Sequence, residues 1–263
     1  MPLVLVLCCA ARLLLFPHAA VLQADRVQGG ERAPRASHAN GAGYGAPASE
    51  RVGESEGQRP SDDDDVVRAL TAVRERAAAG DPLAQFSLGA FLYFGSPQTA
   101  EGNDWIRKAA LQRFAPAEYH LGQVYEFGFG VQQDDRLALE WYRKAAGDGS
   151  VPAHRAIGEF YLKGRAVRAD AAEAARWFRR GADGDDLRAQ YQLGQLHFDG
   201  TGVPRDYESA YVWFTVAAGQ TPLEDNRKGL LELRNIAAAR MTPAAIAAAT
   251  RRVAAWKPVV RSQ

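Results

Sequence analysis

Cysteine is almost absent from this chain, and its absence removes several kinds of site. The 263 residues contain 2 cysteines, and both lie close to the start of the chain, at Cys8 and Cys9. Beyond that segment the chain can form neither a disulfide nor a thiolate metal site. We therefore expect no metal centre and no bound cofactor.

An excess of one charge is also missing. The chain has 32 Lys and Arg residues against 31 Asp and Glu residues, so the formal net charge is +1. Proteins that bind nucleic acid generally carry a strong positive field. The whole-chain charge thus gives no reason to expect a nucleic-acid partner.

Signs of catalysis are equally scarce. Neither the H-E-x-x-H metal motif nor a phosphate-cradling G-K-[ST] loop occurs. His120, His154 and His197 lie at different positions of the repeating pattern described below and share no helix face. We expect ordinary surface or half-buried histidines there, and we predict that the protein is not an enzyme.

Only one long apolar run is present, and it opens the chain as MPLVLVLCCAARLLLFPHAAVLQAD. Arg12 interrupts it, and it is too short to span a bilayer comfortably. It resembles a secretory signal with Ala24 at the cleavage position, although no Lys or Arg precedes the apolar core. We expect residues 1–24 to be a signal peptide and the protein to be periplasmic or secreted. The alternative is a cytoplasmic protein with an N-terminal extension.

Polar residues dominate the next segment. Residues 25–61 are rich in Gly, Ala, Ser, Pro and charge, a composition that cannot bury enough apolar surface to order itself, so we expect a disordered linker. Asp62 to Asp65 then begin the helical pattern of residues 62–79, where acidic side chains suit the positive end of a helix. We predict an N-terminal capping helix, with a calcium site at the four aspartates as the alternative.

What the chain does have is repetition. The phrases NDWIRKAALQ, ALEWYRKAAGDG, AARWFRRGADGD and AYVWFTVAAG place tryptophans 36 residues apart, at Trp105, Trp141, Trp177 and Trp213. Each tryptophan is preceded by one of four related phrases, AQFSLGAFLYFG, AEYHLGQVYEFG, AHRAIGEFYLKG and AQYQLGQLHFDG, whose middle glycines are Gly89, Gly122, Gly158 and Gly194. A fixed period of this size is typical of stacked supersecondary units.

The residue pattern of each unit predicts two helices. The first, which we call the A helix, has apolar or small residues at relative positions 0, 4, 5, 7 and 8, counted from Ala84, Ala117, Ala153 and Ala189. Asp134, Asp170 and Asp206 follow short loops and suit the start of the second, or B, helix. A glycine inside a helix costs about 1 kcal/mol relative to alanine. We therefore infer that the A and B helices cross closely at this glycine, with the tryptophan filling the space between units.

The pattern A-x-x-x-L-G-x-x-Y/F-x-x-G-x-G-V-x-x-D followed by A-x-x-W-F/Y-x-x-A-A-x-x-G resembles the Sel-one-like repeat, a relative of the tetratricopeptide repeat. The resemblance covers about residues 80 to 220, with a shortened first unit and Ala166 in place of a loop glycine. It implies an all-α, right-handed α-solenoid of antiparallel helix pairs. We place the four repeats at 80–113, 114–149, 150–185 and 186–220.

Two helices should close the stack over residues 221–257. Thr242 and Pro243 fit the cap and first turn of the last one. Terminal elements of a repeat stack are expected to depart from the pattern because one face has no neighbour. The ending with M-T-P and a later Trp also resembles the one that follows the repeats in bacterial members, which implies a bacterial source.

The resemblance also implies where a partner binds. In tetratricopeptide-like stacks the A helices line the concave side, and relative positions 2, 6 and 9 point into it. An aromatic groove with charges at its centre suits an extended or helical peptide. The alternative is that these side chains only pack between neighbouring units. The residues are Phe86, Ala90, Tyr93, Tyr119, Gln123, Glu126, Arg155, Glu159, Leu162, Tyr191, Gln195 and Phe198.

A second surface carries a basic pair after each of the first three tryptophans: Arg107 and Lys108, Arg143 and Lys144, Arg179 and Arg180. Stacked together, these pairs could weakly contact an anionic partner or surface. Cations are also favourable near any helix C-terminus, and that explanation is the preferred one.

The sequence therefore predicts a non-catalytic scaffold, a monomer that holds a protein or peptide partner in the concave groove. An anionic-surface or cell-wall binder that uses the basic pairs is the first alternative. A cell-wall-active enzyme is the second, because some cysteine-rich relatives are linked to penicillin binding. This chain lacks their cysteine pairs.

Overall fold

The structure is a computed structural model, and it describes residues 62–95 and 100–259. The predicted signal peptide and linker, residues 1–24 and 25–61, lie outside the described residues. Every element in the described part is an α-helix, in the order α2 Asp62–Ala78, α3 Pro82–Gly95, α4 Ala100–Leu111, α5 Ala115–Phe127, α6 Asp135–Gly147, α7 Val151–Lys163, α8 Ala171–Asp183, α9 Leu187–Asp199, α10 Tyr207–Gln220, α11 Glu224–Ala238 and α12 Pro243–Ala255.

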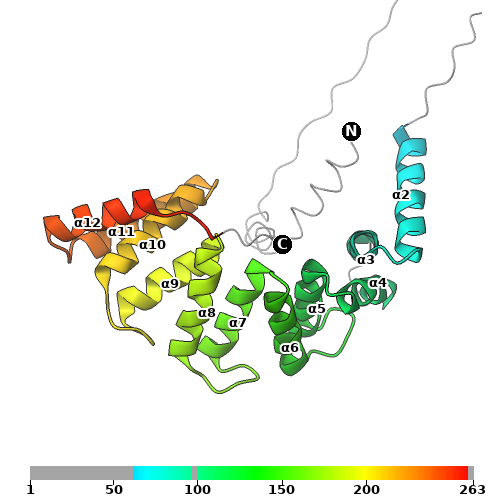
Figure 1. The fold of residues 1–263 in the computed structure, drawn as a ribbon, viewed down its shortest axis with the longest axis horizontal. Helices are drawn as coiled ribbons and strands as arrows, with labels where there is room; N and C mark the ends of the chain where they lie inside the picture. Colours follow the sequence, from blue (N-terminus) through cyan, green and yellow to red (C-terminus); the bar gives the residue numbers. More distant parts are fainter. Residues whose placement is uncertain (1–61, 96–99, 260–263) are drawn as a thin grey trace, which may run out of the picture. The chain divides into compact units, whose positions relative to one another are not determined.

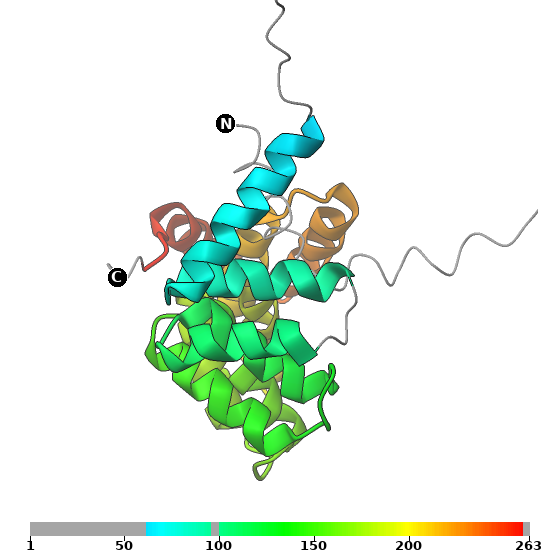
Figure 2. The ribbon, with the colours of Figure 1, turned by 90° about the vertical axis from the view of Figure 1, so that its right-hand side faces the viewer.

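The chain divides into two units, Met1–Ala72 and Val73–Gln263, and α2 crosses their boundary. Within the second unit, helices α3 to α10 form four antiparallel hairpins that follow one another side by side in sequence order (Figure 1). Seen from the end at α3, the hairpins lie in successive layers (Figure 2). The predicted α-solenoid of antiparallel helix pairs is confirmed.

Helix ends form where the sequence predicts them. The carboxylates of Asp134, Asp170 and Asp206 each accept a hydrogen bond from a backbone N–H in the first turn of α6, α8 and α10. The Thr242 hydroxyl accepts one from Ala245 N–H at the start of α12. The A helices α5, α7 and α9 end at left-handed glycines, Gly128, Gly164 and Gly200. These caps satisfy backbone groups that the helices leave free.

The middle glycine of each A helix lies against the B helix of the same hairpin, as inferred. The contacting residue is the one that follows the tryptophan. A Cβ atom added at Gly158 would lie 2.7 Å from the ring of Phe178, and one at Gly122 would lie 2.5 Å from the ring of Tyr142. The same contact joins Gly194 to Phe214 and Gly89 to Ile106. Because these four side chains are at most 1% exposed, they hold the two helices of each hairpin together.

Between hairpins, the core is formed by each B helix and the A helix that follows it. Ile106, Ala109 and Ala110 of α4, for example, pack with Leu121 and Val124 of α5. The tryptophans cover these junctions. Trp141 packs on the α4–α5 cluster, Trp177 on the α6–α7 cluster, and Trp213 belongs to the α8–α9 cluster. These three tryptophans therefore lie between units as expected, whereas Trp105 belongs to none of these clusters.

Two helices follow the last hairpin, and both pack on α10. Leu230 and Ala237 of α11 join a cluster with Phe214. Beyond α12, Trp256 meets Trp213 edge to face, with ring centroids 6.5 Å apart. The C-terminal segment therefore covers the last tryptophan of the repeating series.

Among the described residues, three other than glycine adopt a left-handed backbone conformation, and one of them replaces a repeated glycine. Gly130 and Gly202 have φ near +70° in the loops that precede α6 and α10. The equivalent residue before α8 is Ala166, with φ 58°. A side chain in this conformation costs about 1–2 kcal/mol.

We expect Gly158→Ala to lower the free energy of unfolding by about 1–3 kcal/mol, because the added methyl overlaps the Phe178 ring. The matched control is Gly229→Ala in α11, where an added Cβ meets nothing within 4 Å and higher helix propensity should stabilise by up to about 1 kcal/mol. Urea unfolding followed by circular dichroism measures both changes. Equal effects of the same sign would contradict the close-approach explanation.

We expect Ala166→Gly to raise the free energy of unfolding by about 1 kcal/mol, because glycine adopts the left-handed conformation without steric strain. Ala169→Gly, in the same loop but without a positive φ, is the control. There the added freedom of the unfolded chain should destabilise by roughly 0.4–1 kcal/mol. A fall in thermal stability for both variants would exclude strain at Ala166.

Candidate partner-binding site

The predicted binding residues on the A helices lie mainly between successive repeats. Ala90 is buried, Tyr191 is exposed, and the other residues at positions 2, 6 and 9 are half-buried. Most of the half-buried ones contact neighbouring repeats or their own B helix, so packing accounts for much of this pattern. The hydrogen bonds of Gln123 and Gln195 are to residues of their own A helix. Partner binding by these residues stays a prediction.

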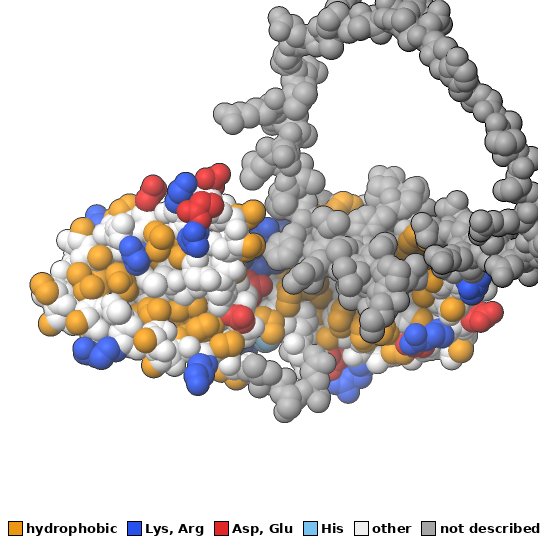
Figure 3. Space-filling model, turned by 90° about the horizontal axis from the view of Figure 1, so that it is seen from above, with side chains coloured by type: hydrophobic (Ala, Val, Ile, Leu, Met, Phe, Trp, Pro, Cys, Tyr) orange, Lys and Arg blue, Asp and Glu red, His pale blue; other side chains and the backbone are white. Residues whose placement is uncertain are grey.

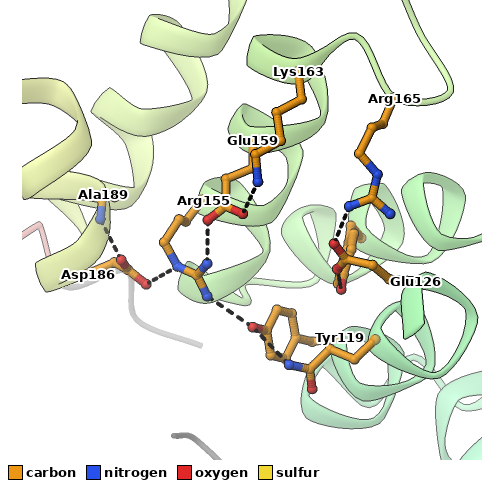
Figure 4. Close-up of polar contacts among 10 residues, drawn as sticks. Tyr119, Glu126, Arg155, Glu159, Lys163, Arg165, Asp186 and Ala189 are labelled. Carbon is orange, nitrogen blue, oxygen red and sulfur yellow. Dashed lines mark hydrogen bonds and ion pairs between the residues drawn. The ribbon is translucent and has the colours of Figure 1, made fainter. Parts of the chain in front are cut away.

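Arg155 shows how packing uses a position predicted to bind a partner. Its guanidinium donates to the Glu159 carboxylate at 2.7 Å and to the Tyr119 hydroxyl at 3.2 Å. Its Nε lies 3.5 Å from the Asp186 carboxylate, which also caps α9 by accepting from Ala189 N–H (Figure 4). One side chain on α7 thus connects α5, its own helix and the start of α9.

Burial makes this charge cluster interdependent. The side chains of Arg155 and Asp186 are only 14% and 13% exposed. Burial raises the pKa of Asp186, and the nearby Arg155 partly offsets that rise. Burial opposes the charge on Arg155, but Tyr119, Asp186 and Glu159 outweigh it and raise the pKa of Arg155. The cluster holds three repeats in register and leaves little of the Arg155 charge for a partner.

Glu126 takes part in a second bridge between repeats. Its carboxylate accepts from the Tyr142 hydroxyl at 2.6 Å and from Arg165 at 2.7 Å (Figure 4). Arg165, in the loop before α8, also donates from Nε to Asp135 at 3.0 Å. The hydrogen bond from Arg165 holds the pKa of Asp135 below its usual value.

Aromatic contacts also connect the first two repeats. The His120 ring contacts the Phe86 ring, with centroids 6.1 Å apart, and the Tyr93 ring, with centroids 5.4 Å apart. Tyr93 in turn meets Phe129 at 5.9 Å. These rings join α3 to α5 and to the loop that follows α5.

The prediction that all three histidines are surface or half-buried is wrong for two of them. His120 and His154 are both buried, each 8% exposed, because they occupy the junctions between hairpins. Burial lowers the pKa of His120 to about 4, so the ring is neutral at physiological pH. Only His197 is half-buried as expected.

The basic pairs are engaged within the fold. The second cation of each pair lies over the ring of its own tryptophan: Lys108 over Trp105 at 3.9 Å, Lys144 over Trp141 at 3.9 Å and Arg180 over Trp177 at 4.4 Å. The first members are Arg107, which lies 3.7 Å from Asp104, Arg143, which donates to the Tyr161 hydroxyl, and Arg179, which donates to Asp183. Cation–π contact and ion pairing explain the pairs without an anionic partner.

Tyr191 and Gln195 are the part of the predicted site that stays open. Tyr191 is 37% exposed, although its ring also contacts Phe214. One turn later, the Gln195 amide donates to the Asp199 carboxylate at 3.3 Å, while its Oε1 is buried and accepts no hydrogen bond from the described protein. A buried acceptor without a donor is costly. This face of α9 therefore has both apolar area and unmet hydrogen-bonding capacity.

Other kinds of site are not supported by the described residues. No group of three or more His, Cys, Asp and Glu side chains in them could hold a metal ion, and none of their helices is long and apolar enough to cross a membrane. The side chains of Asp62 to Asp65, the alternative calcium site, lie outside the described set. Residues 53–57, G-E-S-E-G, have the spacing of a hydrolase nucleophile motif that sequence reasoning missed, and they too lie outside the described part.

The model of the Sel1 repeat matches residues 82–114, 115–150, 151–186 and 187–221, which together make up more than half of the chain. The chain belongs to the Sel1 repeat family. Sel1 repeat proteins are generally non-catalytic and generally act as scaffolds for protein–protein interaction. None of the curated proteins compared with this chain matches it significantly.

Solved Sel1 repeat structures resemble this one. A Sel1 repeat protein from Oxalobacter formigenes is 30% identical, with a TM-score of 0.57, over 68% of this chain and 81% of that one. A protective antigen of uropathogenic Escherichia coli, c5321, is 27% identical with a TM-score of 0.48, over 72% of this chain and 48% of that one. Both are bacterial proteins.

Arg155→Met should lower the free energy of unfolding by about 3–5 kcal/mol, because it leaves the buried carboxylate of Asp186 without its cation. Arg179→Met is the control, since its pair with Asp183 is exposed and worth at most about 1 kcal/mol. Urea unfolding at neutral pH compares the two. If both variants unfolded at the same urea concentration, the Arg155 cluster would have no special structural role.

Proposed function

We propose that this Sel1 repeat protein is a non-catalytic scaffold that binds a protein or peptide partner on its A helices, with the α9 face of Tyr191 and Gln195 as the centre of contact. The observation that carries the proposal is the combination of an exposed ring and a buried, unpaired amide oxygen on one turn of one helix. Family membership supports the class of function, and the α9 face supports the location.

The chemistry of this face favours a polypeptide. An aromatic ring provides a large contact area at a low cost in side-chain entropy. Gln195 is half-buried, so the exposed part of its side chain can contact a polar group of the partner. On the neighbouring A helix, the side chain of Lys163 is 59% exposed, so its charge is available to a polar residue of the partner.

The opposite case, binding through a broad charged surface, has less support. In the space-filling view, the part formed by α10 to α12 carries patches of hydrophobic side chains and a group of charges of both signs, rather than a broad surface of one sign (Figure 3). The basic pairs are engaged with rings and carboxylates, as described above. We keep export to the periplasm or beyond as a proposal, supported by the apolar opening segment of the sequence.

A photo-crosslinking amino acid at Tyr191 should capture a partner in the cells that make this protein, and Gln195→Ala should weaken the capture several-fold. The matched control places the same crosslinker at Arg176, an exposed residue on the B helix α8. Mass spectrometry identifies what is captured. Recovery of the same proteins in equal amounts from both positions would remove the α9 face as the binding site.

A further inference from the structure

One position of the A helix makes a hydrogen bond to the preceding repeat, and its residue type differs between repeats. It is the residue after the first alanine of each unit: Gln85, Glu118, His154 and Gln190. Gln85 donates from Nε2 to the Ala77 carbonyl at 3.1 Å, and Gln190 donates from Nε2 to the Ala182 carbonyl at 3.3 Å. Both carbonyls lie near the end of the helix that precedes the A helix. The position therefore calls for a hydrogen-bond donor.

Glu118 occupies this position in α5 and has no proton to donate when it is ionised. By the register of the repeats, the carbonyl that faces it is that of Ala110 in α4. Glu118 is only 2% exposed, and its Oε2 is buried without a hydrogen-bond partner in the described protein. A buried, partly unpaired carboxylate is costly, whereas a protonated one can donate a hydrogen bond.

The charged groups around Glu118 determine which carboxyl group binds a proton. Asp148, at the end of α6, lies close enough to Glu118 for the two carboxyl groups to interact, and to share a side-chain hydrogen bond when one of them is protonated. Arg113, in the turn before α5, pairs with Asp148, and Lys144 of α6 is the remaining charged neighbour. All four side chains line a pocket of about 430 Å³ that Trp141 also borders.

The two carboxyl groups differ in their affinity for a proton. The hydrogen bond from Arg113 lowers the pKa of Asp148, so Asp148 stays ionised. Burial, reinforced by the charge of Asp148 and the hydrogen bond to it, raises the pKa of Glu118 to about 7 against the opposing charges of Lys144 and Arg113. Two carboxyls in different environments can share one proton in this way.

We propose that Glu118, Asp148 and Arg113 form a proton-dependent joint between the two helices of the second repeat, at its border with the first. With its proton, Glu118 donates to Asp148, rather than to the preceding helix as Gln85 and Gln190 do, and closes the first turn of α5 against the end of α6. Without it, two carboxylates face each other in a buried site, and the packing of α5 on α4 and α6 loosens. This joint does not depend on the proposed binding of a partner.

The raised pKa of Glu118 determines how the stability of the fold changes with pH. Glu118 binds its proton with a pKa of about 7 in the folded chain, against 4.5 as the ordinary value. Its stabilising contribution is complete below pH about 4.5 and is lost progressively as the pH rises to about 7. Each pH unit in this window changes the folding equilibrium constant by up to tenfold.

The test compares the full chain with Glu118→Gln in urea unfolding at pH 5.5 and pH 8.5. The Gln side chain carries a donor at both values, as in the first and fourth repeats. Between the two pH values, the wild-type folding constant should fall about 30-fold more than that of the variant. Glu140→Gln, at an exposed position on α6, is the control and should keep the wild-type fall. Equal falls for wild type and Glu118→Gln would overturn the proposal.

Hydrogen exchange of the backbone amides separates a local joint from a general pH effect. After correction for intrinsic exchange rates, amides of α5 should exchange several-fold faster at pH 8.5 than at pH 5.5 in the wild type, and at similar corrected rates in Glu118→Gln. Amides of α9, which is remote in sequence, serve as the internal reference. An equal acceleration in α5 and α9 would show that no joint opens at Glu118.

Discussion

The close contact between a glycine and a large side chain in each hairpin is the constraint on which the rest of this structure depends. Gly122, Gly158 and Gly194 have no side chain, so the rings of Tyr142, Phe178 and Phe214 lie directly against the backbone of the A helix. The two helices of a hairpin then approach at a distance that no other residue would allow. Because the contact recurs every 36 residues, each hairpin has the same shape and can stack on the next.

Stacking identical hairpins forces the polar side chains of the A helices into the space between repeats. There they must find partners, since a buried charge without a partner is strongly unfavourable. Arg155 does so with Tyr119, Glu159 and Asp186, and Arg165 does so with Glu126 and Asp135. Side chains that the sequence pattern assigns to a binding surface are therefore engaged in contacts between repeats. Tyr191 and Gln195 are the members of the predicted set that retain exposed area and unmet hydrogen-bonding capacity.

Glu118 is the contrasting case, because it is buried and its Oε2 has no hydrogen-bond partner in the described protein. At the equivalent position, Gln85 and Gln190 supply a donor to the preceding helix, whereas Glu118 has a proton to donate only when its carboxyl group is protonated. A repeat protein offers an internal comparison of this kind, because the same site occurs several times with different residues. Here the comparison identifies the one repeat junction in the described chain where a carboxyl group replaces an amide or an imidazole.

The fold could be predicted from the sequence because its determinants are local or periodic. The spacing of Trp141 and Trp177, the mid-helix glycines and the capping residues Asp134, Asp170 and Asp206 all report on contacts within one hairpin or between adjacent ones. The candidate site could be predicted only as a set of helix positions. The pattern does not distinguish a ring that faces solvent from one that packs on the next repeat, as His120 and Tyr93 illustrate.

By itself, the sequence determined the repeat period, the helix ends, the class of fold and the absence of thiol chemistry beyond the first residues. The tertiary structure alone decided which residue packs between the two helices of a hairpin, which charged groups are paired between repeats and which side chains remain exposed to solvent. The reason is physical: a period records what every repeat has in common, whereas exposure and pKa depend on which particular side chains the stack brings together across its junctions.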